Sequence, residues 1–566
     1  MSERDVPGAL EELNLTPLEE WRDLHVHLKL WPHFIWPPFL RPCRVRILLV
    51  TDAGGSFGTG TFGLKGLIDA LAVPPGPWVR FEITTANRRA DPTADIQNFA
   101  FDSTNLGDFD EIWMFGVERS FTPGLSQTEL RAISEFMDSG GGVFATGDHE
   151  DLGVSMCGSV PRVRSMRKWH WPNPGPNNEP VAPPVGGLDR LDTLRQGPSP
   201  GFEFDDQSDV VPQNISPRMY PSWSFPWKFL WMFHPHPLLC GPRGVIRVLP
   251  DHPHEGECYV PADLTASFTF DGYTIEEYPA FAGTRLAPEV IATSSIVGGR
   301  ASVDVKGPVT PRSFGAIGAW DGHRVSRGRV VVDATWHHFF NINLTGDPFS
   351  TDPAKQVGFL ASPQGLAAYE EIKSYFRNIA VWLARPQRHA CMRWRALWGC
   401  RWHHRLAMDL RPPYLETLRD LDLPELLRIG DAATDVLGRL ASQCQGRIWI
   451  IDIIKEVLPR PWPIIEPLVD PWWPIPPDPE PDPVPWLHGN TLVEAALGGA
   501  LYALGSEFRD PSPEMVDRAD DYDWAATVRP GIQIAARETL RTVERSRRAE
   551  DELARALAEE GESEGA

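Results

Sequence analysis

The chain has 566 residues, a formal net charge of −22, and 42% hydrophobic and 23% charged residues. Its length exceeds what one hydrophobic core serves, so we expect a globular protein of two or three domains. The acidic charge argues against a nucleic-acid groove, which needs clustered Lys and Arg. The sequence has no transmembrane segment, because no run of about 18 apolar residues occurs, and the N-terminus lacks a signal-peptide pattern. We therefore expect a cytoplasmic protein.

Composition divides the chain into five predicted segments. They are an arm rich in aromatic residues and proline (1–43), an α/β domain (44–385), a helical segment (390–456), an extended linker rich in Pro and Trp (457–489), and a helical region with an acidic tail (490–566). Proline hinders regular strand pairing and favours extended linkers. Because exposed aromatic residues mark interfaces, the arm and residues 457–566 predict self-association or a protein partner.

Apolar runs in the α/β domain alternate with helical patterns. We expect strands at 45–51, 79–84, 111–115, 143–146, 290–296, 313–319 and 328–338. The clearest helix begins after Ser126, with Glu129 completing a capping box, and ends at Gly140. Strands that alternate with helices predict a parallel sheet with helices on both faces. The irregular insertion 152–288 is predicted to cover the carboxyl edge of that sheet.

Ionisable residues follow four of these strands. Asp52 follows the first, Glu118 the third, Asp148 and His149 the fourth, and His337 and His338 the last. The carboxyl ends of parallel strands share one edge, so we expect a common site there. His149 and one of His338 and His337 would act as acid and base or as metal ligands, with Asp148 and Asp52 orienting them. The alternative is that the two aspartates are turn or cap residues.

The α/β domain contains one basic island, formed by Arg162, Arg164, Arg167 and Lys168 and followed by Trp169. Arginine forks match carboxylate and phosphate groups, and tryptophan offers an apolar face to a sugar. We therefore expect Arg164, Arg167, Trp169 and Glu118 to bind a small polar ligand. The alternative is that these cations pair with neighbouring acids.

A second cluster in the insertion consists of His252, His254, Glu255 and Glu257. Imidazole nitrogen and carboxylate oxygen both suit a divalent metal, which is the cofactor that this cluster predicts. Its spacing fits no standard metal motif, and a solvated acidic turn is the alternative. The seven cysteines contain no CxxC pair, so a thiolate zinc site is not indicated.

Several short motifs in residues 44–385 resemble the ThuA-like branch of the class I glutamine amidotransferase-like superfamily. The strand 47–52, the helix and glycines at 130–142, the run 236–241 with 254–259, and the strand 328–338 are similar to that family's pattern. The resemblance implies a flavodoxin-like fold and a link to sugar metabolism. The family's amidotransferases carry a nucleophilic Cys after the fourth strand, where this chain has Asp148 and His149. Glutaminase activity is therefore not expected, whereas ThuA-like proteins often carry a histidine near this place.

These patterns leave two functions open. One is a hydrolase or lyase that acts on a small polar, carbohydrate-derived substrate through the His and Asp residues at the carboxyl edge. The other is a non-catalytic, amidotransferase-like scaffold in a larger assembly. Measurements of bound metal and of the native mass of the protein distinguish these two functions.

Overall fold

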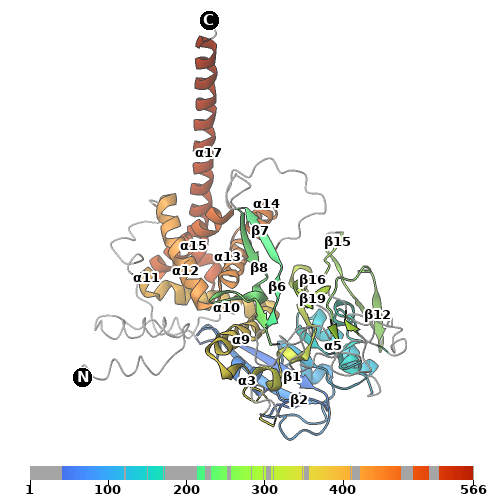
Figure 1. Cartoon of the computed structure of the whole chain (residues 1–566). Coiled ribbons are helices and arrows are strands. Elements are labelled where there is room, and N and C mark those ends of the chain that lie inside the picture. The colour runs from blue at the N-terminus through green and yellow to red at the C-terminus, as the bar shows by residue number, and fades with distance from the viewer. Residues whose placement is uncertain are drawn as a thin grey trace, which may run out of the picture. The chain divides into compact units, whose positions relative to one another are not determined.

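The structure, a computed structural model, describes residues 41–119, 123–148, 151–169, 171, 213–223, 231–250, 256–281, 283–296, 299–300, 308–309, 312–346, 348–349, 356–407, 410, 421–472, 489–508 and 522–564. The chain divides into two compact units (Figure 1). The α/β unit comprises residues 43–218 and 235–390, and the helical unit comprises 1–42, 219–234 and 391–566. No helix among the described residues is both long and apolar enough to cross a membrane.

The α/β unit is built on a mixed eight-stranded sheet with the order β2-β1-β3-β4-β20-β19-β16-β6. These strands are β1 (Cys43–Thr51), β2 (Val79–Asn87), β3 (Glu111–Phe115), β4 (Gly142–Thr146), β6 (Ser216–Pro217), β16 (Glu289–Ile296), β19 (Arg312–Trp320) and β20 (Val330–Asp333). The first five strands in the order run parallel, which confirms the predicted parallel pairing for the strands up to β4 and for the last predicted strand, β20. The last three are antiparallel to their neighbours, so the sheet is mixed and not parallel throughout.

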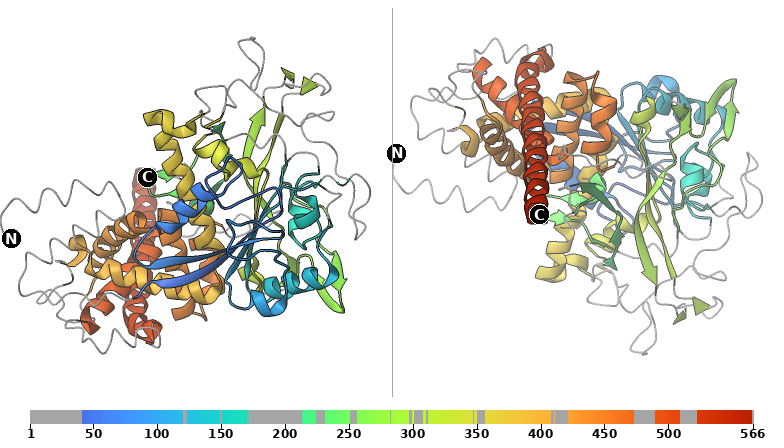
Figure 2. Two further views of the ribbon diagram at one scale, coloured as in Figure 1. Left: turned by 90° about the horizontal axis from the view of Figure 1, so that it is seen from below. Right: turned by 90° about the horizontal axis from the view of Figure 1, so that it is seen from above.

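Helices cover both faces of this sheet (Figure 2). On one face α5 (Gln127–Asp138) packs its apolar stripe against the inward side chains of the central strands. On the other face α9 (Pro363–Leu383) lies against α3 (Lys65–Ala72) and contacts β4 and β20. The α/β class that the alternating pattern predicts is therefore confirmed.

Shorter elements complete the α/β unit. The helices are α4 (Ser103–Leu106), α6 (Val154–Cys157), α7 (Val163–Met166), α8 (Asn341–Leu344), and the 3-10 turns η1 (Pro237–Leu239), η2 (Gly322–Val325), η3 (Trp336–His338) and η4 (Gly358–Ala361). The strands are β5 (Gln213–Asn214), β9 (Cys240–Gly241), β10 (Gly244–Val245), β11 (Val248–Leu249), β12 (Ser267–Phe270), β13 (Tyr273–Glu276), β14 (Ala280–Phe281), β15 (Thr284–Arg285), β17 (Gly299–Arg300) and β18 (Pro308–Val309). The last predicted strand is shorter than expected, because β20 ends at Asp333 and η3 carries the two histidines.

Local chemistry explains where α5 begins and ends. The Ser126 hydroxyl accepts from the Glu129 backbone N–H, and the Glu129 carboxylate accepts from the Ser126 backbone N–H, which is the capping box that the sequence predicts. Gly140 has a φ of +94°, a left-handed conformation that glycine adopts without steric cost. The chain therefore reverses directly into β4.

The helical unit contains the hairpin strands β7 (Met219–Trp223) and β8 (Trp231–Pro235) and a set of helices. The helices are α10 (Pro386–Trp402, beginning in the α/β unit), α11 (His404–Ala407), α12 (Leu423–Leu440), α13 (Gln443–Val457), α14 (Trp462–Val469), α15 (Gly489–Glu507) and α17 (Trp524–Glu564). Part of the predicted extended linker is helical. Pro463 lies in the first turn of α14, where a backbone N–H needs no intrahelical acceptor.

Glycines allow the backbones of three of these helices to approach closely. A Cβ added to Gly498 of α15 would clash with the Leu426 carbonyl oxygen of α12, and one added to Gly499 would clash with Gly531 of α17. Both obstacles are backbone atoms, which cannot move aside as a flexible side chain can. The small residues in α15 are therefore required by packing.

We predict that Gly498→Ala lowers the free energy of unfolding of the helical unit by about 2 kcal/mol, because overpacking against the backbone outweighs the gain in helix propensity. Gly60→Ala is the control, since a Cβ at Gly60 meets no atom within 4 Å. Chemical denaturation followed by circular dichroism measures both changes. Equal stability of the two variants would contradict the packing argument.

Candidate functional site

Asp52 links the ends of β1 and β3 at the carboxyl edge of the sheet. Its side chain is 2% exposed. Its Oδ2 atom accepts hydrogen bonds from the backbone N–H groups of Val117 and Glu118, at 2.7 and 2.8 Å. Asn87 steadies the same turn, because its Nδ2 group donates to the Thr51 hydroxyl and to the Asp52 carbonyl oxygen. The carboxyl group is therefore fixed where the chain leaves two neighbouring strands.

Burial raises the pKa of Asp52 to about 7, although the two N–H donors act in the opposite direction. The negative charge of Glu118 raises it further. Glu118 in turn forms a 3.4 Å ion pair with Arg89. A carboxyl group with such a pKa exchanges its proton near neutral pH, which suits acid–base chemistry.

Asp148 and His337 meet at the ends of β4 and β20. The Asp148 side chain is fully buried, and its Oδ2 lies 3.4 Å from Nε2 of His337, which is 20% exposed. Nδ1 of His337 lies 2.9 Å from Oδ1 of Asn343. The Thr335 hydroxyl donates to Asp148 Oδ1 and accepts from the His337 backbone N–H. The imidazole is thus held by oxygen atoms on both of its nitrogens.

His338 contacts a different group of residues from His337. It is fully buried, and its Nδ1 lies 2.7 Å from Asp333 Oδ1. Asp333 Oδ2 accepts a hydrogen bond from the Tyr375 hydroxyl of α9 at 2.8 Å. Burial and this negative charge raise the pKa of Tyr375 well above its ordinary value. The buried position of this set supports a role in packing α9 on the sheet.

Arg167 lies between the two loops that carry the Asp148–His337 pair. Its side chain is 1% exposed. Nη2 donates to the carbonyl oxygens of Asp148 and Ala334 at 2.8 and 2.7 Å, and Nε donates to Ala334 at 3.1 Å. Its guanidinium also stacks on the Trp169 ring at 4.4 Å. The cation therefore joins the backbone after β4 to the backbone after β20.

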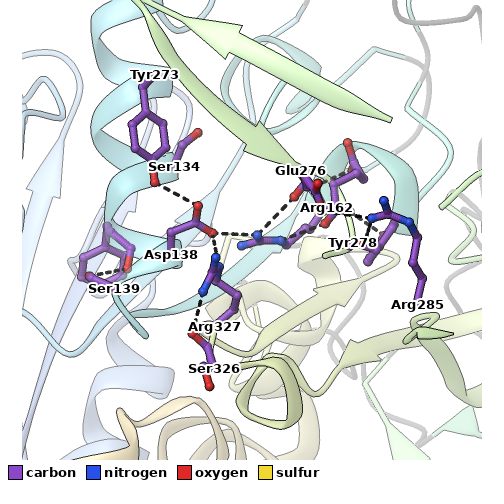
Figure 3. Close-up of polar contacts among 12 residues, drawn as sticks. Ser134, Asp138, Ser139, Arg162, Tyr273, Glu276, Tyr278, Arg285, Ser326 and Arg327 are labelled. Atoms are coloured by element: carbon purple, nitrogen blue, oxygen red, sulfur yellow. Dashed lines mark hydrogen bonds and ion pairs between the residues drawn. The ribbon is translucent and has the colours of Figure 1, made fainter. Parts of the chain in front are cut away.

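The segment that carries Arg167 is anchored by a second buried cation, Arg162 (Figure 3). Arg162 Nη2 donates to Asp138 Oδ1 at the end of α5, and Arg162 Nε donates to the Glu277 carbonyl oxygen. Asp138 also pairs with Arg327 and accepts from the Tyr273 hydroxyl. Arg162 has a φ of +70°, a conformation that costs a non-glycine residue free energy. These contacts hold residues 162–167 in place against the strain.

The other residues of the basic island also have partners within the protein. Arg164 lies 3.6 Å from Glu277 and stacks on Phe268. Lys168 forms a 2.6 Å ion pair with Glu257. Trp169 is 3% exposed and donates from Nε1 to the Val163 carbonyl oxygen. These contacts match the alternative in which the cations pair inside the protein.

Four predicted site residues, His149, His252, His254 and Glu255, lie outside the described residues. Glu257 is described and pairs with Lys168. Within the described ranges, no group of three or more His, Cys, Asp or Glu side chains is placed to hold a metal ion.

Sequence reasoning missed the residues that hold the histidines, namely Thr335, Asn343, Asp333 and Tyr375. Thr335 had a usable signal, because a threonine directly after a strand and before a turn commonly caps that turn. No sequence pattern points to Asn343 or Tyr375, since only the fold brings α8 and α9 to this edge.

Comparison with protein-family models, with curated proteins and with solved structures finds no match to this chain.

We predict that Asp52 makes the folded state less stable as pH rises. Between pH 4 and 7 the folded state keeps a proton that the unfolded state has released, so stability falls through this window by up to roughly 4 kcal/mol and then levels. Asp52→Asn mimics the protonated carboxyl and should flatten this part of the profile. Denaturant unfolding at several pH values measures it, with the exposed Asp69→Asn as control. An unchanged slope in Asp52→Asn would contradict the assigned burial cost.

Proposed function

We propose that the protein is a hydrolase or lyase that acts on a small polar substrate at the carboxyl edge of the sheet, with His337 transferring the proton. The observation that carries this proposal is the placement of His337 between Asp148 and Asn343 while a fifth of its side chain stays exposed. A histidine that is oriented by a carboxylate and still reaches solvent is the usual arrangement of a general acid or base.

The hydrogen-bonding geometry favours a ring that can hold protons on both nitrogens. Nδ1 lies 2.9 Å from Asn343 Oδ1, and Nε2 lies 3.4 Å from Asp148 Oδ2. An imidazolium donates from both atoms and satisfies both oxygens. Its ring also stacks on Trp336, with ring centroids 4.2 Å apart. The neutral ring carries a proton on one nitrogen only, so the other nitrogen can take a proton from a substrate or a water molecule. The imidazolium that forms is then stabilised by both oxygens.

Asp52 would supply the second titratable group. The order β2-β1-β3-β4-β20 of the parallel strands supports a flavodoxin-like arrangement, in which ligands bind where the order reverses between the first and third strands. Asp52 stands at that position and bridges the ends of β1 and β3. We propose that it assists proton transfer in a ThuA-like site. His149 follows Asp148 directly and stays a predicted acid–base group or metal ligand.

A non-catalytic scaffold is the second candidate. The observation that favours it is the long exposed part of α17, where the described side chains from Leu540 to Ala556 are exposed or only half-buried. An assembly role and an active site are compatible, because they use different units of the chain.

The test is turnover of p-nitrophenyl glycosides, p-nitrophenyl esters and a uronate-containing oligosaccharide, whose β-elimination leaves an unsaturated product. We expect His337→Ala and Asp148→Asn each to lower kcat at least about 100-fold, the usual contribution of a positioned acid or base. Glu135→Gln, on the outer face of α5, is the control and should keep full activity. Turnover that survives His337→Ala, with the protein folded by circular dichroism, would contradict the assignment.

A further inference from the structure

The second half of α17 is a helix without a covering layer from the described chain. Residues 524–539 pack within the helical unit through buried side chains such as Val528, Ile532 and Ala535. From residue 540 the pattern changes, and Leu540 and Leu553 are 53% and 60% exposed. Figure 1 shows this half continuing past the ends of α12 and α15. A helix of this kind is marginal alone in water and gains stability when another helix covers it.

One face of this half carries a stripe with alternating spacings of three and four residues. Its members are Leu540, Val543, Arg547, Glu550, Ala554 and Leu557. Such spacing keeps the positions on one side of a helix and is the pattern that pairs two helices in a coiled coil. Apolar residues occupy both ends of the stripe, and one cation and one anion occupy its middle.

Charge is distributed unevenly along the same segment. Residues 537–548 contain five arginines and two glutamates, whereas residues 549–564 contain seven acidic residues and one arginine. The half nearer the unit is therefore basic, and the half nearer the C-terminus is acidic. In the described structure neither Arg547 nor Glu550 forms an ion pair, so both charges stay available to a partner.

We propose that two copies of this chain associate through residues 540–557 of α17 in an antiparallel coiled coil. In that register Leu540 of one copy faces position 557 of the other, Val543 faces Ala554, and Arg547 faces Glu550. Each basic half then lies along an acidic half. A parallel pair would instead set Arg547 against Arg547 and Glu550 against Glu550, and like charges repel at close range. Charge complementarity thus favours a second copy of this chain as the partner, and it favours the antiparallel over the parallel arrangement.

The inference is independent of the proposed active site, because α17 belongs to the helical unit and His337 to the α/β unit. The paired segment from 540 to 557 is about 27 Å long at 1.5 Å per residue, which accommodates about two and a half heptads. The apolar layers supply the attraction, and the central ion pairs set the register and direction.

The first experiment measures mass by analytical ultracentrifugation of the full chain. We expect a dimer, and we expect Arg547→Glu alone or Glu550→Arg alone to raise its dissociation constant at least about tenfold, equivalent to about 1.4 kcal/mol. The double exchange Arg547→Glu with Glu550→Arg should restore the dimer. Arg545→Glu makes the same charge change off the stripe and is the matched control. A monomeric wild-type chain, or a dimer that Arg547→Glu leaves unchanged, overturns the proposal.

The second experiment tests direction by disulfide trapping. Leu540→Cys and Leu557→Cys chains are prepared separately, mixed and oxidised. An antiparallel pair cross-links the two variants to each other and leaves each alone uncross-linked, whereas a parallel pair cross-links Leu540→Cys with itself and overturns the proposal. The free native cysteines of the described residues, Cys157, Cys240, Cys258, Cys400 and Cys444, are buried and do not compete. Leu540 is exposed, so its replacement by cysteine should leave the fold of the monomer intact, and circular dichroism of both variants checks this.

Discussion

The carboxyl edge of the sheet depends on one buried guanidinium group. Arg167 is almost completely enclosed, and it donates to the carbonyl oxygens of Asp148 and Ala334. These carbonyls belong to the chain just after β4 and just after β20. Without Arg167 each of these two carbonyl oxygens would lose a hydrogen bond, at a cost of about 1–3 kcal/mol each where no other donor replaces it. The fork of an arginine suits this place because it reaches both backbones from one rigid group.

The Arg167 cation also offsets the negative charges of two aspartates at this edge. Asp148 and Asp333 are fully buried, and their negative charges stabilise the charged form of Arg167 against the cost of burial. Buried charges of one sign are expensive unless an opposite charge lies close. This balance lets Asp148 stay beside His337, where the proposed function requires a carboxylate. The structural contacts and the proposed chemistry therefore share one edge, and Arg162 and Asp138 anchor the segment that carries Arg167.

The fold could be predicted from the sequence where local chemistry decides the outcome. The capping box of Ser126 and Glu129 and the apolar runs of the central strands gave the correct elements, and the order of elements gave the parallel pairing. The antiparallel addition of β16 and β19 could not be predicted, because strand direction depends on how the irregular insertion returns the chain to the sheet. α14 was missed because prolines suggest extended chain. The first turn of a helix accepts Pro463, and this short helix also contains Pro467 in its interior.

The candidate site was predictable only in part. Topology placed Asp52, Glu118, Asp148 and the later histidines at the carboxyl edge, since strand ends in a parallel sheet share one side. The partners of Arg167 were not predictable, because backbone carbonyl oxygens carry no signature in the sequence. In the sequence, an arginine beside a tryptophan is as consistent with ligand binding as with a structural role inside the protein. Only the burial of the Arg167 side chain distinguishes these two roles.

Arg167 holds the loops after β4 and β20 together through its hydrogen bonds to the carbonyl oxygens of Asp148 and Ala334. Hydrogen exchange of the Trp336 backbone amide, which donates to Gly147 across these loops, tests it most directly. In Arg167→Lys, which keeps the charge and loses the fork, we predict that this amide exchanges at least about tenfold faster, a loss of local stability of about 1.4 kcal/mol. The Val143 amide, which donates to Arg329 where β4 and β20 pair, should keep its rate. Unchanged protection of Trp336 in a folded variant would contradict the account.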